Sequence, residues 1–217
     1  MVVNRELKHL HVHVMKTGGT SLRFNLTKHK WNKKSDKLKG LSAHSTLKTI
    51  ENNPHLFDEL GDFHKTIMIR NPWEHAVSAY RHVLDVKTFY AANYFAHKNF
   101  KKNVEQFDIT NLDLSFERFV KNAYITGFAQ SNFTYESNEL KFDEWFDYRN
   151  YDKMIKYFSD KYNINLVNDM RERYHKNIKY VIDMDINKPY QEFYNDTSYE
   201  IVKNISKNEI NRFNYKF

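Results

Sequence analysis

The stretch HVHVMKTGGTSLRFNL, residues 11–26, places a lysine, two glycines and several hydroxyl groups in one short turn. Gly18 and Gly19 allow the backbone to turn sharply and to approach a ligand closely. A helix that follows such a turn directs its first N–H groups and the positive end of its dipole at the same place. The side chains that add hydrogen-bond donors there are Lys16, Thr17, Thr20 and Ser21. This combination predicts a binding site for an oxyanion of the phosphate type.

The turn differs from the nucleotide-binding P-loop in the position of its lysine. The P-loop pattern G-x-x-x-x-G-K-[ST] has the lysine after the glycines, whereas Lys16 precedes them. The alternative interpretation is a strand-to-helix turn that uses its glycines only for shape. The pattern therefore argues against a Walker loop and leaves the kind of anion open.

A second candidate anion site is IRNPWEHAVSAY, residues 69–80. Arg70 follows a short apolar run, and Ser78 lies about two turns inside the expected helix, so both could reach one phosphate at the helix end. An arginine fork with a hydroxyl group suits phosphate. An ATP or GTP hydrolase would be expected to carry an acidic residue for magnesium at this strand end. The alternative is a solvated or salt-bridged Arg70 and an ordinary helical Ser78.

A strand, a turn and a helix must position the first constellation. Residues 7–15 are expected to form a strand, because histidines alternate with apolar residues in it, with Leu10 on one side and His11 on the other. Residues 21–30 are expected to form a helix that Thr20 or Ser21 caps.

A second unit of the same kind carries Arg70 and Ser78. Residues 67–69 are short and apolar, as in a buried parallel strand. Asn71 is expected to cap a helix whose first residue is Pro72. The apolar stripe of this helix consists of Trp73, Val77, Tyr80 and Leu84.

Two strand-turn-helix units in one small chain favour an α/β fold with a parallel sheet. A short strand ending near Ser42 and a helix from about Ser45 to Pro54 are expected between them. The chain shows no linker or repeat, so we expect one domain over residues 1–217. Residues 87–113 have no firm period, and further helices are expected over residues 114–123, 151–162 and 198–213.

Both motifs resemble those of sulfotransferases that use 3′-phosphoadenosine 5′-phosphosulfate (PAPS). HVMKTGGTSLR resembles the H-I-P-K-T-G-G-T-S-L-R loop of that family, and IRNPWEHAVSAY resembles its R-N-P-x-x-R-x-x-S-x-Y motif. The ending NEINRFNYKF is similar to that of the carbohydrate branch, which includes heparan sulfate 2-O-sulfotransferases. Met15 stands where the family has proline, and His75 where it has arginine. The resemblance implies a three-layer, P-loop-like α/β fold with a central parallel sheet flanked by helices.

The resemblance also implies roles for individual residues. Lys16 would bind the phosphosulfate bridge and stabilise the leaving phosphate, while Arg70 and Ser78 would hold the 3′-phosphate. PAPS would be the co-substrate and adenosine 3′,5′-bisphosphate (PAP) the product, with no metal required. The acceptor would be a hydroxyl group, expected on a carbohydrate. The loop donors implied by the family are Thr17, Gly18, Gly19, Thr20 and Ser21.

His44, in SAHSTL, is the candidate general base, because the related branch tends to carry a histidine before a helix at this point. A histidine is suited to accept the hydroxyl proton near neutral pH. The alternative is a histidine that caps the helix or packs in the core.

Composition limits the remaining possibilities. The net charge of +7 favours anionic partners. The lack of cysteine excludes disulfides and thiolate zinc sites. The sequence contains neither a membrane-span-length apolar run nor a signal peptide, so we expect a cytoplasmic protein without a membrane span.

Three other interpretations compete with the sulfotransferase. One is an ATP-dependent phosphotransferase with a variant P-loop, and another is a basic nucleic-acid-binding module, suggested by FAHKNFKK; no RNA or DNA motif is present, and we expect no nucleic-acid partner. A metal triad of His9, His11 and His13 is disfavoured, because same-face neighbours on a strand lie about 6.7 Å apart and the outer two cannot share a zinc ion.

Overall fold

The structure is a computed structural model that describes residues 1–29, 31, 41–93, 115–136, 139–167 and 188–217. The chain divides into two compact units, the first formed by Met1–Arg70 and Gln130–Arg171 and the second by Asn71–Ala129 and Glu172–Phe217. The single domain expected for residues 1–217 stays a prediction.

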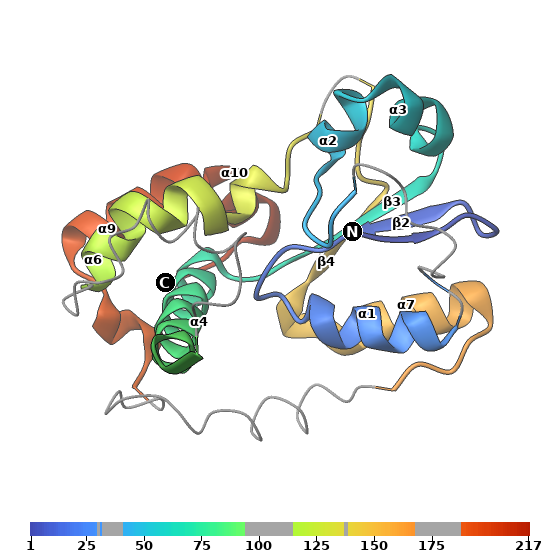
Figure 1. Ribbon diagram of the computed structural model, residues 1–217. Helices are drawn as coiled ribbons and strands as arrows, with labels where there is room; N and C mark the ends of the chain where they lie inside the picture. Colours follow the sequence, from blue (N-terminus) through green and yellow to red (C-terminus); the bar gives the residue numbers. More distant parts are fainter. Residues whose placement is uncertain (30, 32–40, 94–114, 137–138, 168–187) are drawn as a thin grey trace. The chain divides into compact units, whose positions relative to one another are not determined.

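The first unit contains a four-stranded sheet with the strand order β1-β2-β3-β4 (Figure 1). Strand β1 is antiparallel to β2, whereas β2, β3 and β4 are parallel to one another. The α/β class and the mostly parallel sheet flanked by helices are therefore confirmed. The strands are β1 (Val2–Asn4), β2 (His9–Val12), β3 (His64–Ile69) and β4 (Glu144–Asp147).

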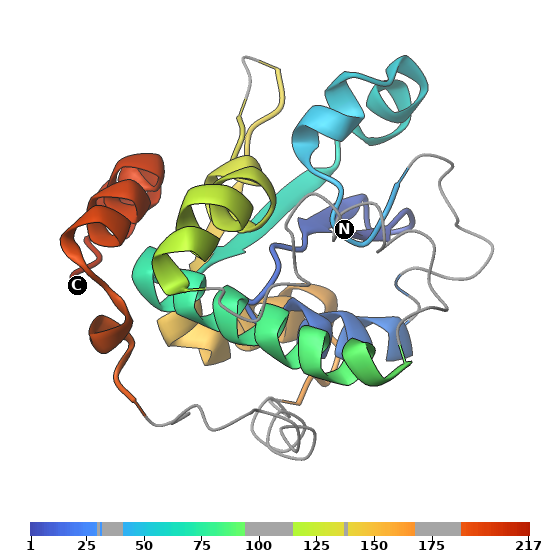
Figure 2. The ribbon, with the colours of Figure 1, turned by 60° about the vertical axis from the view of Figure 1, so that its left-hand side comes forward.

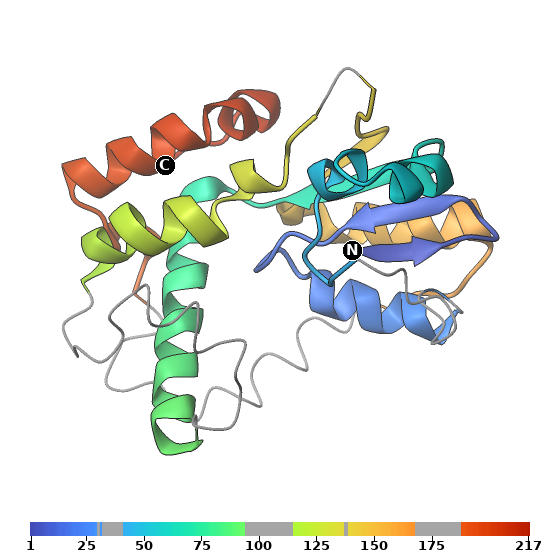
Figure 3. The same cartoon turned by 45° about the horizontal axis from the view of Figure 1, so that its top comes forward.

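Helices cover this sheet. Figures 1 and 3 show α1 and α7 along one face and α2 and α3 on the other side. Leu22 and Leu26 of α1 and Phe158 of α7 belong to one buried apolar cluster with Met68 of β3. Burial of such side chains is the main favourable contribution to folding. The helices of this unit are α1 (Gly19–Lys28), α2 (Leu47–Glu51), α3 (Pro54–Leu60), η4 (Gln130–Asn132), η5 (Tyr148–Asn150) and α7 (Tyr151–Tyr162).

The histidine side of β2 is buried as completely as its apolar side. The ring of His9 stacks on Phe158 of α7 at 5.1 Å, and the hydroxyl of Thr66 lies 3.0 Å from His9 Nε2 and 3.0 Å from His11 Nδ1. These rings therefore serve as polar core residues. Within the described ranges, no three His, Asp or Glu side chains form a group that could hold a metal ion.

The second unit is helical. Helices α4, η3 and α9 pack against one another (Figure 2). Aromatic side chains dominate the core: Tyr80 lies 5.3 Å from Phe116 and 5.4 Å from Phe119, measured between ring centroids. Among the described helices, none is both long enough and apolar enough to cross a membrane. The elements are α4 (Pro72–Asn93), α6 (Phe116–Phe119), η3 (Val120–Phe128), η6 (Tyr190–Phe193), α9 (Asp196–Ile205) and α10 (Lys207–Phe213).

Several predicted elements are confirmed, and others differ in their ends. The helix over 151–162 has the predicted bounds, and α4 begins at Pro72 as expected. The helix over 198–213 is two helices that meet at Ser206, and that over 114–123 continues as the π-helix η3.

The region between the two motifs departs further from the prediction. Thr46 caps α2, whereas Pro54 begins a separate helix, α3, because Asn53 caps it and a proline fits a first helical turn. Residues 41 and 42 are not in a strand, and the rest of the short strand expected there lies outside the described residues, as do residues 94–113.

Candidate functional site

The candidate site lies at one edge of the sheet of the first unit. Strands β2, β3 and β4 are parallel, so the residues that follow them come out at the same edge. The turn from His13 to Ser21 follows β2, Arg70 follows β3, and Tyr148 follows β4. Ligands of open α/β sheets bind at this edge, because the loops and helix N-termini there present free polar groups.

The turn after β2 is built from two residues in the left-handed region. Lys16 has φ 62° and Gly18 has φ 77°, and α1 begins directly afterwards at Gly19. The Gly18 carbonyl accepts hydrogen bonds from the N–H groups of Ser21 and Leu22, at 3.1 and 3.3 Å. The first N–H groups of a helix have no partner within that helix, so those that precede Ser21 in α1 point out of its end.

The expected side-chain cap is wrong. The N-cap of α1 is Gly18, without a side-chain hydrogen bond, so Thr20 and Ser21 lie inside the first turn. The reason is the left-handed Gly18, which starts the helix earlier than a serine or threonine cap would. Thr20 is exposed and Ser21 is buried.

The two glycines are required for different reasons. Gly18 adopts a backbone conformation that side chains disfavour. Gly19 instead packs on His13: a Cβ atom at residue 19 would lie 2.0 Å from His13 Cδ2 and 2.4 Å from Nε2. The imidazole of His13 therefore lies directly beneath the start of α1.

The buried side chain of Thr17 makes a hydrogen bond within the turn. Its hydroxyl donates to the Val14 carbonyl at 2.9 Å, and the side chain is 1% exposed. The hydroxyl proton is thus already used, and the structural contribution of Thr17 is to fix the loop beside Lys16.

His44 adjoins the turn from the segment before α2. Its ring lies 4.8 Å from that of His13, and its Nδ1 is 3.2 Å from the His13 carbonyl oxygen. A carbonyl can only accept, so Nδ1 carries the hydrogen and Nε2 of neutral His44 is left as an acceptor. The structure therefore brings His44 to the predicted anion loop in the tautomer that a general base requires.

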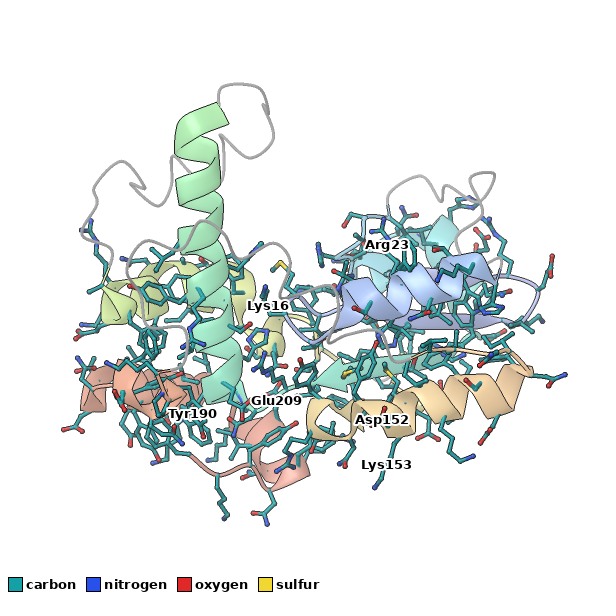
Figure 4. The ribbon with its side chains drawn as sticks, turned by 90° about the horizontal axis from the view of Figure 1, so that it is seen from below. Lys16, Arg23, Asp152, Lys153, Tyr190 and Glu209 are labelled. Carbon is teal, nitrogen blue, oxygen red and sulfur yellow. The ribbon has the colours of Figure 1, made fainter. Side chains whose placement is uncertain are left out.

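Burial and nearby positive charge favour the neutral form of both imidazoles. Burial is the main cause that lowers the pKa of His13, to about 2, and the neighbouring His44 adds to it. Desolvation also lowers the pKa of His44, although the ring reaches solvent and its bond to the His13 carbonyl raises the value in part. Arg23 on α1 lowers both pKa values further; Figure 4 labels it together with Lys16, which precedes the helix.

Arg70 is held at two points. Its N–H donates to Gln130 Oε1 at 2.8 Å, and its carbonyl accepts from Gln130 Nε2 at 2.7 Å. Its guanidinium lies 4.7 Å above the ring of Tyr148. Gln130 and Tyr148 were missed at the sequence level because both lie between the helices expected over 114–123 and 151–162, where no element was predicted; the only signal was the aromatic run EWFDY before the second of these helices.

Ser78 and His75 belong to α4 of the second unit, whereas the other predicted site residues belong to the first. As predicted, Asn71 caps α4: its Oδ1 accepts from Trp73 N–H at 3.1 Å. Ser78 is partly exposed. His75 is completely buried, with Nδ1 3.1 Å from the Tyr124 hydroxyl. The residue at the position of the family arginine is thus a core side chain and presents no surface cation.

Fold and site together define an α/β protein with a glycine turn, a neutral histidine and an arginine held by Gln130 and Tyr148 at the carboxyl ends of a mostly parallel sheet. No protein-family model, curated protein or solved structure matches this chain. The geometry of the site and its motifs are therefore the basis for a function.

Proposed function

We propose that the protein is a sulfotransferase that moves the sulfuryl group of PAPS to an acceptor hydroxyl, expected on a carbohydrate, and releases PAP. The observation that carries the proposal is His44, whose Nε2 is left as an acceptor beside His13, where the turn that leads to Ser21 begins. An anion loop alone would fit many phosphate ligands, whereas an anion loop with an adjacent neutral base fits transfer to a hydroxyl.

The turn would hold the phosphosulfate. Backbone N–H groups at the start of α1 and the ammonium of Lys16 would neutralise the charge that develops on the bridging oxygen as its bond to sulfur breaks. Lysine and N–H groups can supply this stabilisation without a metal ion. The rigidity that Thr17 and the packing of Gly19 on His13 give the turn would keep these groups in place.

His44 would accept the proton. The acceptor oxygen attacks sulfur in line with the leaving phosphate oxygen, the new S–O bond forms as the old one breaks, and the hydroxyl proton passes to His44 Nε2. The resulting imidazolium would be stabilised by its Nδ1–H bond to the His13 carbonyl.

Arg70 and Ser78 would hold the 3′-phosphate, which distinguishes PAPS from a 5′-nucleotide. The fork geometry of arginine matches phosphate oxygens, and the motif resemblance assigns the hydroxyl of Ser78 to the same phosphate. A P-loop-like arrangement of the parallel strands follows from the same proposal. The cation after β3 disfavours a magnesium-dependent ATP enzyme, which needs an acidic group there.

Nucleotide binding provides the first test. PAP should raise the melting temperature of the wild-type protein, and Lys16→Ala and Arg70→Ala should abolish the increase. Lys28→Ala is the matched control, because Lys28 is a cation at the other end of α1, where it lies over Phe24. Protection by ATP with magnesium and none by PAP would contradict the proposal and select a phosphotransferase.

Transfer provides the second test. Labelled sulfate should pass from PAPS to members of a panel of glycans and small hydroxylated compounds. His44→Ala should retain PAP binding and lose at least about 100-fold in transfer rate, the usual contribution of a general base. Undiminished transfer by this variant would remove His44 from the base role.

Salt-sensitive binding to DNA or RNA that Lys16→Ala leaves unchanged would favour a nucleic-acid module instead.

A further inference from the structure

The backbone of Arg70 is fixed by a side chain instead of a neighbouring strand. Gln130 bonds to both the N–H and the carbonyl of Arg70, as a paired residue of an adjacent strand would. Gln130 is completely buried, and its own carbonyl accepts from Phe133 N–H at 2.7 Å and Thr134 N–H at 3.1 Å. The chain at Arg70 is therefore held in one position where β3 ends.

The guanidinium of Arg70 is fixed separately by an aromatic ring. Its central carbon lies 4.7 Å from the centroid of Tyr148, a distance typical of a cation–π contact. Tyr148 begins η5, which Asp147 caps by accepting from Arg149 N–H at 2.9 Å. Asp147 also accepts from Arg149 Nε at 2.8 Å, so the nearby second arginine is engaged by this carboxylate.

This arrangement suits the binding of a tetrahedral dianion. Stacking uses the face of the guanidinium, while phosphate oxygens bind in its plane, so the two contacts are compatible. A free arginine side chain loses rotamer entropy when it binds a ligand, and a preset one loses less. The ring of Tyr148 thus contributes to affinity without touching the ligand.

We propose that Tyr148 is a positioning residue that presets Arg70 as a receptor for a phosphate monoester, with Gln130 holding the backbone. The inference rests on the proposed function for the identity of the ligand, the 3′-phosphate of the nucleotide. It adds a prediction that the motifs do not contain: a residue after β4 determines the preference for nucleotides that carry a 3′-phosphate.

The test compares two ligands by isothermal titration calorimetry. Tyr148→Leu should weaken the binding of PAP by about three- to tenfold, the range of one cation–π contact, and leave the binding of adenosine 5′-phosphate unchanged. Tyr148→Phe keeps the ring and should restore PAP binding. Tyr135→Leu is the matched control in the same unit, because Tyr135 lies 5.6 Å from the ammonium of Lys48; it should bind both ligands as wild type does.

Three results would overturn the positioning role. One is an equal loss for both ligands, which would indicate general damage to the site. Another is a loss in Tyr148→Phe as large as in Tyr148→Leu, which would assign the effect to the hydroxyl. The third is unchanged PAP binding in Tyr148→Leu.

Failure of the proposed function would give a different result. If the wild-type protein binds neither nucleotide, the function is refuted, and the receptor is tested with inorganic phosphate. Phosphate should then protect Arg70 from phenylglyoxal, measured by peptide mass spectrometry, in the wild type and in Tyr148→Phe, but less in Tyr148→Leu. Absence of protection in the wild type would overturn the inference as well.

Discussion

Two regions of the first unit, the start of β2 and the turn after it, each contain a buried histidine, and the two histidines differ in the hydrogen bonds of their ring nitrogens. At the start of β2, His9 bonds through both ring nitrogens, Nδ1 to the Tyr162 hydroxyl and Nε2 to Thr66. Beyond its end, Nδ1 of His13 is buried without a hydrogen-bond partner among the described residues, and Gly19 packs on the ring. Two histidines of one alternating series, four residues apart, therefore differ: His9 is a fully hydrogen-bonded core residue, and His13 is an incompletely hydrogen-bonded residue of the turn. Incomplete satisfaction of this kind is expected at functional sites.

The largest expected effect is a loss of stability of the first unit in acid, to which the histidines of β2 and of the turn both contribute. Burial first, and neighbouring cationic groups second, lower the pKa of His9 to about 2, of His11 to about 3 and of His13 to about 2, from 6.5. The unfolded chain therefore binds more protons below pH 6.5, so the stability is fully present above that pH and is lost as the pH falls. At pH 5 the three histidines together cost on the order of 6 kcal/mol, comparable to the whole stability of a domain.

Urea unfolding at pH 7.5, 6 and 5 measures this loss. The groups around His9 include Tyr162, His64 and Lys161, of which none carries a negative charge near neutral pH that could offset an imidazolium. His11→Gln removes one titrating group and should reduce the slope of stability against pH by one proton. A stability that does not change between pH 7.5 and 5 would show that these rings are not kept neutral by burial.

The next effect concerns His75, the buried counterpart of the histidines in the second unit. His75→Arg introduces the arginine of the sulfotransferase motif that the sequence resembles, but it places a cation at a completely buried position. An uncompensated buried charge costs about 3–5 kcal/mol, so the variant should unfold at much lower urea concentration than wild type and gain no affinity for PAP. His75→Gln, which is neutral and polar, is the control. Tighter PAP binding by a stable His75→Arg would place this side chain at the ligand.

Substitution of Gly19 tests how tightly the turn after β2 is packed. Gly19→Ala adds a methyl group 2.0 Å from His13 Cδ2 and should cost about 1–3 kcal/mol, the usual range for overpacking. Gly127→Ala is the matched control, because a Cβ atom there meets nothing within 4 Å.

A double variant shows whether His13 is the cause. His13→Ala with Gly19→Ala removes the ring that the methyl group would meet, so it should recover part of the stability lost in Gly19→Ala. Urea unfolding of the two single variants and the double variant gives the coupling energy. Additive losses would mean that the glycine is required for a reason other than His13.

These contrasts also show what the sequence could predict. Local signals were sufficient for α7, whose apolar residues recur at helical spacing, and for the Asn71-Pro72 start of α4. They failed for the start of α1, because a left-handed Gly18 replaced the side-chain cap. Strand β1 was missed, because three residues at a sheet edge carry no period.

The missed site residues depend on contacts that are remote in the sequence. Gln130 and Tyr148 are far from Arg70 in the sequence, although the first hydrogen-bonds to its backbone and the second lies against its guanidinium. Neither residue type by itself predicts such a contact. The glycine turn after β2 could be predicted because its residues are consecutive in the sequence, whereas the environment of Arg70 is assembled by the sheet. For the same reason the alternation of β2 predicted a strand but not the burial of its histidine side.

The smallest effect tests the electrostatic link between Arg23 and His44. Desolvation lowers the pKa of His44 below 6.5, and the cation of Arg23 adds a smaller lowering. Arg23→Gln should therefore raise the pKa by a fraction of a unit, measured from the imidazole proton shifts of His44 in an NMR titration. Arg23 is exposed, so salt should screen the interaction, and the difference between variant and wild type should shrink at 1 M salt, where the Debye length is about 3 Å. A pKa that falls in Arg23→Gln, or a difference that salt leaves intact, would mean that the cation acts on His44 through the packing of α1 and not through its charge.

In the transfer reaction, the same shift should move the acid limb of the rate profile toward higher pH, because only neutral His44 can accept the hydroxyl proton.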